Sequence, residues 1–174
     1  EIFVLDAGLK YPDSSLFGID VVIPDMDFFE QYGDRVAGIF ITHGHADSIG
    51  ALPYILRKYD IPVFGSQLSI ELAKIEVQRE NKHRKNSLFH VIDADTEIDF
   101  KNASISFFHT THSIPDSLGI DVHTPEGEIV YTGDFKFDPT AAKNYHTDMD
   151  RLAEIEHRGV LALLSDSSNA EASF

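Results

Sequence analysis

Three side chains that commonly bind metals alternate with small residues in one short stretch of the sequence. His43, His45 and Asp47 occupy every second position directly after residues 38–41, an apolar run that predicts a buried strand. In an extended segment, residues two apart point to the same side, so these side chains are expected to converge at the strand end. Imidazole and carboxylate ligands together suit zinc or manganese. The alternative is a polar loop whose histidines cap the next helix, and the joint pattern with the side chains described next favours the metal site.

Two further strands are predicted to lead into side chains of the same kind. Residues 104–108 lead into His109 and His112, and residues 128–131 lead into Asp134. Nearby glycine allows the tight turns that a shared site at one sheet edge requires. Considered alone, His109 and His112 are each better explained as histidines whose hydrogen bonds are satisfied at a sheet edge. Asp134 alone is better explained as the cap of a turn. Together with the first cluster, these residues predict one metal site.

The elements that must position these residues follow from hydrophobic periodicity. Alternation and short apolar runs predict strands at residues 2–5, 38–41, 63–64, 88–92, 97–100, 104–108, 118–122, 128–131 and 160–164. Helical spacing predicts helices at residues 27–32, 49–59, 148–157 and in the segment that follows Ser66. Pro53 fits a first helical turn, Ser66 is a suitable N-cap and Gly159 a suitable stop. This order favours an α/β (α+β) fold in which helices pack outside the sheets.

Composition limits the classes of protein to consider. The chain has 174 residues, 43% of them hydrophobic, which suits a globular domain with a real core. It contains no cysteine, so disulfides and thiolate metal sites are excluded. The formal net charge of −15 argues against broad electrostatic binding of nucleic acid by this segment. The basic run at residues 82–85 is interpreted as a solvated helix end rather than as an RNA contact. No stretch approaches the roughly 20 apolar residues of a membrane span, so no membrane partner is expected.

The phrases around the candidate ligands resemble a known family. His43-Gly-His-Ala-Asp47, His112 and Thr132-Gly-Asp134 are similar to the ligand motifs of the metallo-β-lactamase superfamily. Residues 112–117, 131–137 and 164–170 resemble ribonuclease J, and in particular its degenerate second paralogue in Gram-positive bacteria. The resemblance implies a metallo-β-lactamase-type αββα sandwich, truncated at both ends. Residues 1–164 would be the N-terminal part of the metal-binding domain, and residues 165–174 would begin the connection to an absent β-CASP domain.

The resemblance also implies a role for each candidate residue. The implied metal ligands are His43, His45, Asp47, His112 and Asp134. The three histidines would hold the first ion, Asp134 would bridge to a second ion, and Asp47 would belong to the second ion and orient the reacting water. Asp6 and Asp166 match supporting positions of the family rather than ligands, and Asp166 would orient a later histidine.

Ser48 departs from the active pattern of the family, His-x-His-x-Asp-His, which has histidine at this position. A hydroxyl is a poor substitute for a neutral imidazole as a ligand of zinc or manganese. One site for Zn²⁺ or Mn²⁺ would therefore be largely intact and the second degraded. The resemblance thus implies a cytoplasmic ribonuclease of weakened activity that degrades RNA in the 5′-to-3′ direction. Some members of the family also cut endonucleolytically. The implied role is RNA processing, including that of rRNA, and RNA decay.

The expected partners are RNA, further copies of the same chain in a homo-oligomer, and a ribonuclease J paralogue in a hetero-oligomer. The chain opens in strand-like sequence without Met, so we expect it to be a piece of a longer protein and to expose apolar surface where the rest would dock. Two alternatives remain for its function. One is an inactive structural or regulatory partner of an active paralogue. The other is a different hydrolase on the same fold, such as a thioester or lactam hydrolase.

Overall fold

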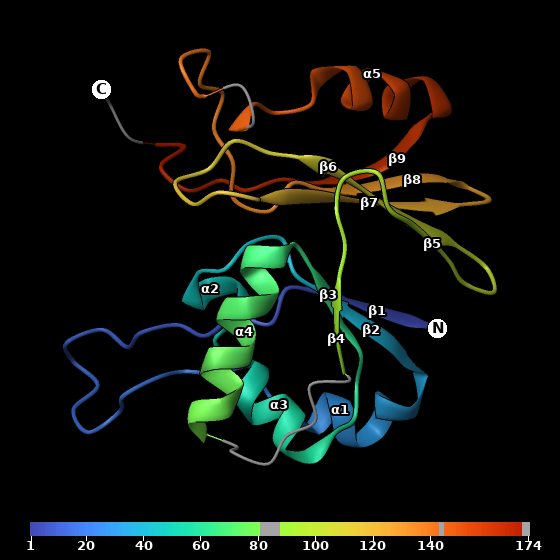
Figure 1. Ribbon diagram of the computed structural model, residues 1–174. Coiled ribbons are helices and arrows are strands. Elements are labelled where there is room, and N and C mark those ends of the chain that lie inside the picture. Colours follow the sequence, from blue (N-terminus) through green and yellow to red (C-terminus); the bar gives the residue numbers. More distant parts are fainter. Residues whose placement is uncertain (81–87, 143–144, 172–174) are drawn as a thin grey trace. The chain divides into compact units, whose positions relative to one another are not determined.

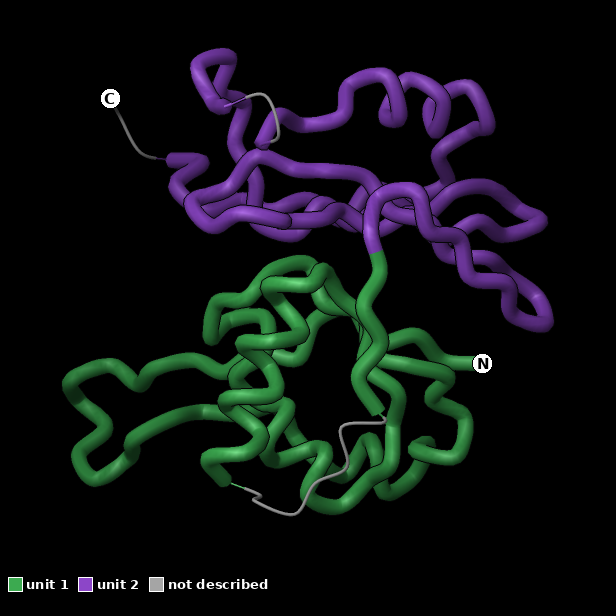
Figure 2. The backbone as a smooth tube through the Cα atoms, in the orientation of Figure 1, with its two compact units in different colours: residues 1–92 green, residues 93–174 purple. Residues whose placement is uncertain are grey.

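The structure is a computed structural model that describes residues 1–80, 88–142 and 145–171. The chain divides into two compact units, residues 1–92 and residues 93–174 (Figure 2). Each unit has its own sheet, which gives two sheets with associated helices (Figure 1). The basic run at residues 82–85 and the last three residues of the expected connection at 165–174 lie outside the described residues.

Unit 1, residues 1–92, contains a parallel sheet with strand order β1-β2-β3-β4. Its strands are β1 (Ile2–Leu5), β2 (Val36–Phe40), β3 (Val63–Gly65) and β4 (Phe89–Val91). Its helices are α1 (Asp27–Tyr32), η1 (Gly33–Arg35), α2 (Ala46–Ile49), α3 (Leu52–Lys58) and α4 (Gln67–Glu80). Parallel strands need crossover connections, which these helices supply, so the carboxyl ends of all four strands lie at one edge of the sheet.

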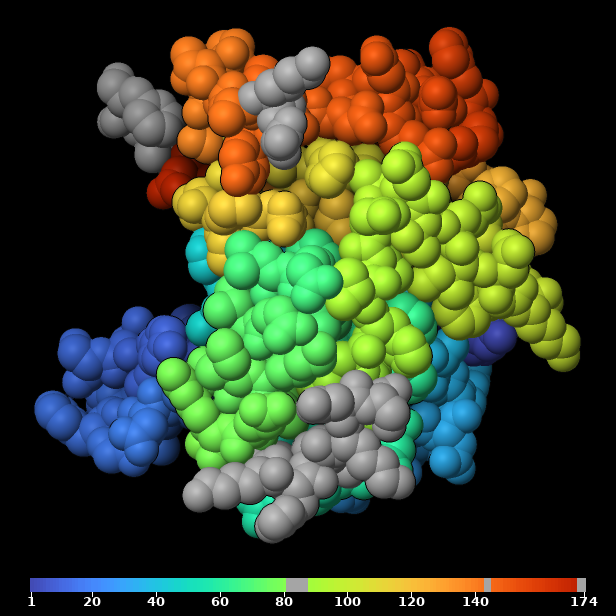
Figure 3. All heavy atoms as spheres, viewed as in Figure 1, coloured from blue at the N-terminus to red at the C-terminus, as the bar shows by residue number. Residues whose placement is uncertain are grey.

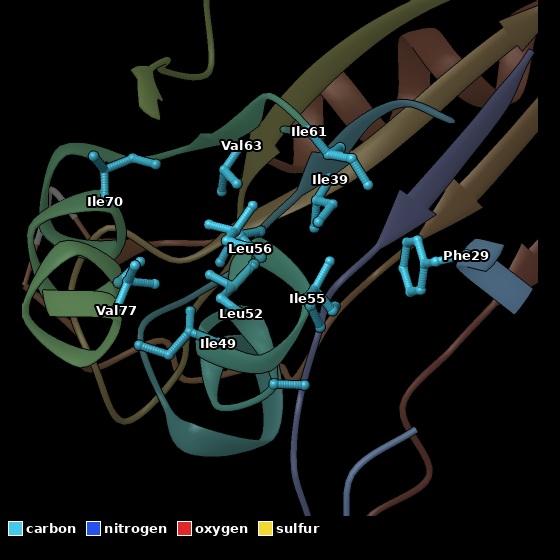
Figure 4. Close-up of a cluster of buried hydrophobic side chains, with 14 residues drawn as sticks. Phe29, Ile39, Ile49, Leu52, Ile55, Leu56, Ile61, Val63, Ile70 and Val77 are labelled. Carbon is cyan, nitrogen blue, oxygen red and sulfur yellow. The ribbon is translucent and has the colours of Figure 1, made fainter. Parts of the chain in front are cut away.

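The core of unit 1 lies between its sheet and the helices α3 and α4 (Figure 4). Leu52, Ile55 and Leu56 follow helical spacing along α3, and each is at most 1% exposed. They belong to one cluster of buried residues with Ile39 of β2 and Val63 of β3. Burial contributes about 1.5–3 kcal/mol for each side chain of this size, so the core firmly holds the strand that precedes the first candidate ligands.

Unit 2, residues 93–174, contains a sheet with strand order β5-β6-β7-β8-β9. Its elements are β5 (Glu97–Asp99), β6 (Ser104–His109), β7 (Leu118–Thr124), β8 (Gly127–Tyr131), α5 (Met149–Arg158) and β9 (Val160–Leu164). Strands β5 to β8 pair antiparallel, and β9 pairs parallel with β8. It follows that β6, β8 and β9 run in the same direction, and their carboxyl ends lie at one edge.

Helix α5 lies along one face of the unit 2 sheet (Figure 1). Its Ile155 is 1% exposed and packs against Phe108 of β6 and Val130 of β8. Asp148 caps the helix by accepting a hydrogen bond at 3.0 Å from a backbone N–H of the first turn. Gly159 ends it with φ of 94°, a backbone conformation that side chains disfavour. The sequence predicted the end at Gly159, whereas the cap formed by Asp148 is seen in the structure.

A long loop leaves the body of unit 1 between β1 and α1. Lys10 and Val22 pair at its base. The loop projects outward from unit 1, in blue at the left of Figure 3, and its Phe17 is 93% exposed. This loop carries apolar side chains but none of the candidate ligands.

The expected mixed α/β class with two sheets is confirmed, and one helix needs correction. Every expected strand is present, with its ends within two residues of the prediction. The single helix expected at residues 49–59 is wrong, because α2 and α3 are separated at Gly50 and Ala51. The backbone N–H of Ala51 donates to the carbonyl of Ala7 at 2.7 Å instead of continuing α2. Pro53 does lie in the first turn of α3, as predicted. Among the helices of the described residues, none is both long and apolar enough to span a membrane.

Candidate metal centre

His43 follows β2, and its buried imidazole is held through one ring nitrogen. Nδ1 lies 2.9 Å from the hydroxyl of Thr42 and 3.0 Å from that of Ser48. Thr42 in turn is anchored on Asp6, because its backbone N–H donates to Oδ1 at 2.8 Å and its hydroxyl donates to Oδ2 at 2.9 Å. Histidine ligands of metals commonly have their second nitrogen hydrogen-bonded in this way. Nε2 is therefore the atom of His43 that would coordinate a metal.

Asp47 lies in the first turn of α2 and not in an extended segment. The expected alternation therefore ends at His45, the N-cap residue, after which the backbone turns into helix. One helical turn brings Asp47 Oδ1 to 3.6 Å from His43 Nε2. The ring of His45 stands edge-on to that of His43, with centroids 4.8 Å apart. The three side chains do come together, but by a helical turn, and the side chain of His45 makes no capping hydrogen bond to α2.

The segment after β1 is braced against the backbone of α2. The N–H of Ala7 donates to the carbonyl of Ser48 at 2.7 Å. Gly8 passes so close to α2 that an added Cβ would lie 1.6 Å from the carbonyl oxygen of Asp47. Only glycine fits at this position, so the supporting carboxylate of Asp6 and the turn that carries Asp47 are held in fixed relation.

Unit 2 carries its two candidate ligands at the ends of β6 and β8. His112 Nε2 and Asp134 Oδ2 lie 3.8 Å apart, because the two strands run in the same direction and end at the same edge. Gly133, with φ of 57°, forms the turn that precedes Asp134. His109, by contrast, is the last residue of β6 and is exposed.

Asp166 follows β9, the third strand that ends at this edge. Its carboxylate accepts a hydrogen bond at 2.8 Å from the backbone N–H of Ser168, and its own N–H donates to the hydroxyl of Thr132 at 3.0 Å. Burial alone would raise the pKa of Asp166, but the donors of Ser168 and the charge of His112 lower it below its usual value. The hydrogen bonds from Ser168 therefore favour the charged form of Asp166.

The donor atoms in both units suit a divalent cation. They are imidazole nitrogens and carboxylate oxygens, the ligand types that zinc and manganese take. The separations of 3.6 Å in unit 1 and 3.8 Å in unit 2 exceed hydrogen-bond lengths. The separation of His112 and Asp134 is close to the about 3.4 Å that separates two donors bound at about 2.1 Å to one tetrahedral ion. The chemistry and spacing of these side chains therefore fit a metal.

One supporting residue was missed by sequence reasoning. Thr42 joins the carboxylate of Asp6 to the ring of His43. The only signal for it in the sequence is a hydroxyl residue placed directly before a candidate ligand, which is too common a pattern to single out.

Comparison with known proteins places this chain in a family. The profile of the metallo-β-lactamase superfamily matches residues 3–166, and the chain belongs to this superfamily. Among individual proteins, it is 59% identical over 169 residues to Ribonuclease J 2 of Streptococcus pyogenes serotype M3, which covers 97% of this chain and 31% of that protein. It is 48% identical over 171 residues to Ribonuclease J 2 of Staphylococcus epidermidis and of Staphylococcus aureus, with 98% of this chain and 30% of each relative covered. The resemblance to ribonuclease J is thus confirmed, and the chain spans about 30% of the length of these curated relatives.

Proposed function

We propose that this chain is part of a metal-dependent ribonuclease of weakened activity. The observation that best supports the proposal is the hydrogen-bond chain from Asp6 through Thr42 to His43, since it prepares a buried imidazole to bind a cation. The ribonuclease names of the relatives support RNA as the substrate. Because the chain spans about 30% of those relatives, the activity is proposed for a protein of their length that contains it.

In this proposal, five side chains serve one metal centre. His43, His45 and His112 would hold the first ion, Zn²⁺ or Mn²⁺, Asp134 would serve both ions, and Asp47 would bind the second. When bound, such ions activate water and balance the charge of the phosphodiester in the transition state. Asp47 and Asp134 orient the attacking water through their carboxylate oxygens. Asp6 and Asp166 support the centre without binding the ions.

The weakened activity follows from Ser48. Its hydroxyl cannot replace the imidazole that the active pattern of the superfamily has at this position, so the second ion is held less firmly. The finer features of the proposal are 5′-to-3′ degradation with some endonucleolytic cutting, a role in rRNA processing, a following β-CASP domain and a cytoplasmic location. Association with further copies and with an active ribonuclease J paralogue belongs to the same proposal.

Ser48 also supports a second candidate function. If the loss of one ligand abolishes hydrolysis, the chain belongs to a structural or regulatory partner of an active paralogue. The metal-binding residues would then be kept for folding or for RNA binding.

The two functions are separated by assaying a full-length protein that contains this chain on 5′-monophosphorylated RNA, with and without Mn²⁺. The first function predicts slow, Mn²⁺-dependent hydrolysis that is lost in His112→Ala. The matched control is His157→Ala, which removes an exposed histidine of α5 and should leave the rate unchanged. Binding of RNA or of the paralogue without any Mn²⁺-dependent hydrolysis would favour the second function.

A further inference from the structure

Ser48 contacts a proposed metal ligand although its own hydroxyl is a poor ligand. The residue is 2% exposed, and its Oγ lies 3.0 Å from Nδ1 of His43. The same Oγ lies 3.3 Å from Oγ1 of Thr42. Ser48 therefore belongs to the group of hydrogen bonds that holds the His43 ring.

Asp6 determines the direction of the hydrogen bonds in this group. A carboxylate only accepts hydrogen bonds, so the single hydroxyl hydrogen of Thr42 is donated to Asp6 Oδ2, 2.9 Å away. The Thr42 oxygen must then accept from its other neighbours. Nδ1 of His43, at 2.9 Å, consequently carries a hydrogen and donates it to Thr42.

The other neutral tautomer of His43 is disfavoured by the same contacts. Without a hydrogen on Nδ1, the lone pair of this nitrogen would face lone pairs of Thr42 Oγ1 at 2.9 Å. In the favoured tautomer, the Nδ1–H lies between the oxygens of Thr42 and Ser48, and Ser48 donates its own hydrogen to Thr42. Nε2 then carries the lone pair that coordination of a metal requires.

We propose that Ser48 is a positioning residue: beside Thr42, its oxygen accepts from the Nδ1–H of His43 and so holds the ring with Nε2 presented for coordination. This inference rests on the proposed metal-binding role of His43. It gives position 48 a role different from the one in the active pattern of the superfamily. There, histidine would bind the second ion, whereas here a hydroxyl supports a ligand of the first ion.

The tautomer can be read in the metal-free protein by long-range ¹H–¹⁵N NMR of the histidine rings. Wild-type His43 should carry its hydrogen on Nδ1. Ser48→Ala should keep this tautomer, which Asp6 and Thr42 set, but the Nδ1 hydrogen should exchange faster with water because it loses one of its two acceptors. The affinity for Zn²⁺, measured by competition with a chelator, should fall by about 10–100-fold in Ser48→Ala. The matched control is Ser69→Ala, which removes another buried hydroxyl of unit 1, 0% exposed and bonded to Ser66 at 2.8 Å. It should change neither the exchange rate of the Nδ1 hydrogen nor the affinity.

A wild-type His43 with its hydrogen on Nε2 would overturn the inference, and this measurement does not depend on how any variant folds. A Ser48→Ala protein that keeps the wild-type exchange rate of the Nδ1 hydrogen and the wild-type affinity would overturn it as well. The NMR measurement needs neither metal nor RNA. A protein that shows the expected tautomers but no hydrolysis would therefore refute the ribonuclease proposal alone.

Discussion

The hydroxyl at position 48 can be exchanged for the imidazole that the active pattern carries. In a full-length protein that contains this chain, Ser48→His should tighten binding of a second ion by more than about tenfold and raise the rate of RNA hydrolysis. The new ring cannot follow the direction of the Ser48 side chain, because Oγ already lies 3.0 Å from His43 Nδ1 and a carbon atom would be too close. It must take another rotamer.

Metal stoichiometry and hydrolysis should be measured together on Ser48→His and wild type. A second ion without a faster rate would contradict the proposal that Ser48 limits the activity and would direct attention to another step, for instance RNA binding. No change in either quantity would mean that Ser48 does not limit the site.

At the scale of elements, the close approach of the segment after β1 to α2 gives a sharp prediction. Gly8→Ala would place Cβ 1.6 Å from the carbonyl oxygen of Asp47, so one backbone segment must move. Overpacking of this kind costs about 1–3 kcal/mol of unfolding free energy. It should also weaken Zn²⁺ binding, because the turn that carries Asp47 shifts. Denaturant unfolding and a metal titration measure the two effects.

Gly33→Ala is the control for this substitution. A Cβ at Gly33 would lie 3.6 Å from the ring of Tyr59, which is an ordinary contact. Its effect on unfolding should stay within about 1 kcal/mol, with unchanged metal affinity. Equal results for the two variants would show that the contact between Gly8 and α2 is not what positions the site.

A second element-scale prediction concerns the buried carboxylates Asp121 of β7 and Glu128 of β8, both 0% exposed. Arg158, at the end of α5, donates to Asp121 at 2.7 Å and to Glu128 at 2.6 Å. Arg158→Met would leave Asp121 without its cation and Glu128 with only His123, and should cost about 3–5 kcal/mol of unfolding free energy. Arg79→Met removes an exposed partner of Glu76 and should cost at most about 1 kcal/mol. If denaturant unfolding gave similar losses of unfolding free energy for Arg158→Met and Arg79→Met, the prediction would be contradicted.

The same carboxylates give a dependence of stability on pH. Burial and then the charge of Glu128 raise the pKa of Asp121 from 3.8 to about 6. Between these values the folded state binds more protons than the unfolded state, so the contribution of Asp121 to stability falls as pH rises. Asp121→Asn should remove this dependence, which amounts to about 3 kcal/mol at most. Unfolding curves at pH 4 and pH 7 test it, and parallel pH profiles for wild type and variant would contradict it.

Local patterns in the sequence predicted most elements, and long-range hydrogen bonds account for what was missed. The caps of α5 and the apolar runs of the strands are local signals, as is the sequence phrase that contains His43. The break between α2 and α3 is not local, because it depends on the bond from Ala51 to Ala7. The hydrogen bond between Ser48 and His43 depends in turn on the start of α2 at Ala46. The alternating pattern had predicted an extended segment there. Hydrophobic periodicity indicates which residues are buried. It cannot indicate which distant polar group will form a hydrogen bond with a given residue.

At the scale of the whole molecule, β9 presents an apolar surface. It is the last strand of its sheet among the described residues, and Val160, Leu161, Leu163 and Leu164 are between 45% and 62% exposed. An exposed apolar edge strand favours association. This agrees with the expectation that the chain exposes apolar surface. We propose that the surface is covered by another part of the longer protein.

Leu163→Lys should therefore reduce self-association of the 174-residue chain, as measured by analytical ultracentrifugation across a concentration series. Its unfolding free energy should change by no more than about 0.5 kcal/mol, because the side chain is exposed. Asn102→Lys adds the same charge at the β5–β6 hairpin and controls for electrostatic repulsion. A wild-type chain that stays monomeric at high concentration would contradict the prediction.

The two sheets also differ in how far along the chain their strand partners lie. In unit 2, β5 to β8 pair with their immediate neighbours in sequence, whereas every pairing in unit 1 spans an intervening helix. Contacts that are local in sequence require less loop-closure entropy, and low contact order goes with fast folding. The antiparallel strands of unit 2 are therefore expected to gain protection from hydrogen exchange before the parallel sheet of unit 1. Although a ribosome would release the segment with His43 first, that segment should reach its folded geometry after the one with His112.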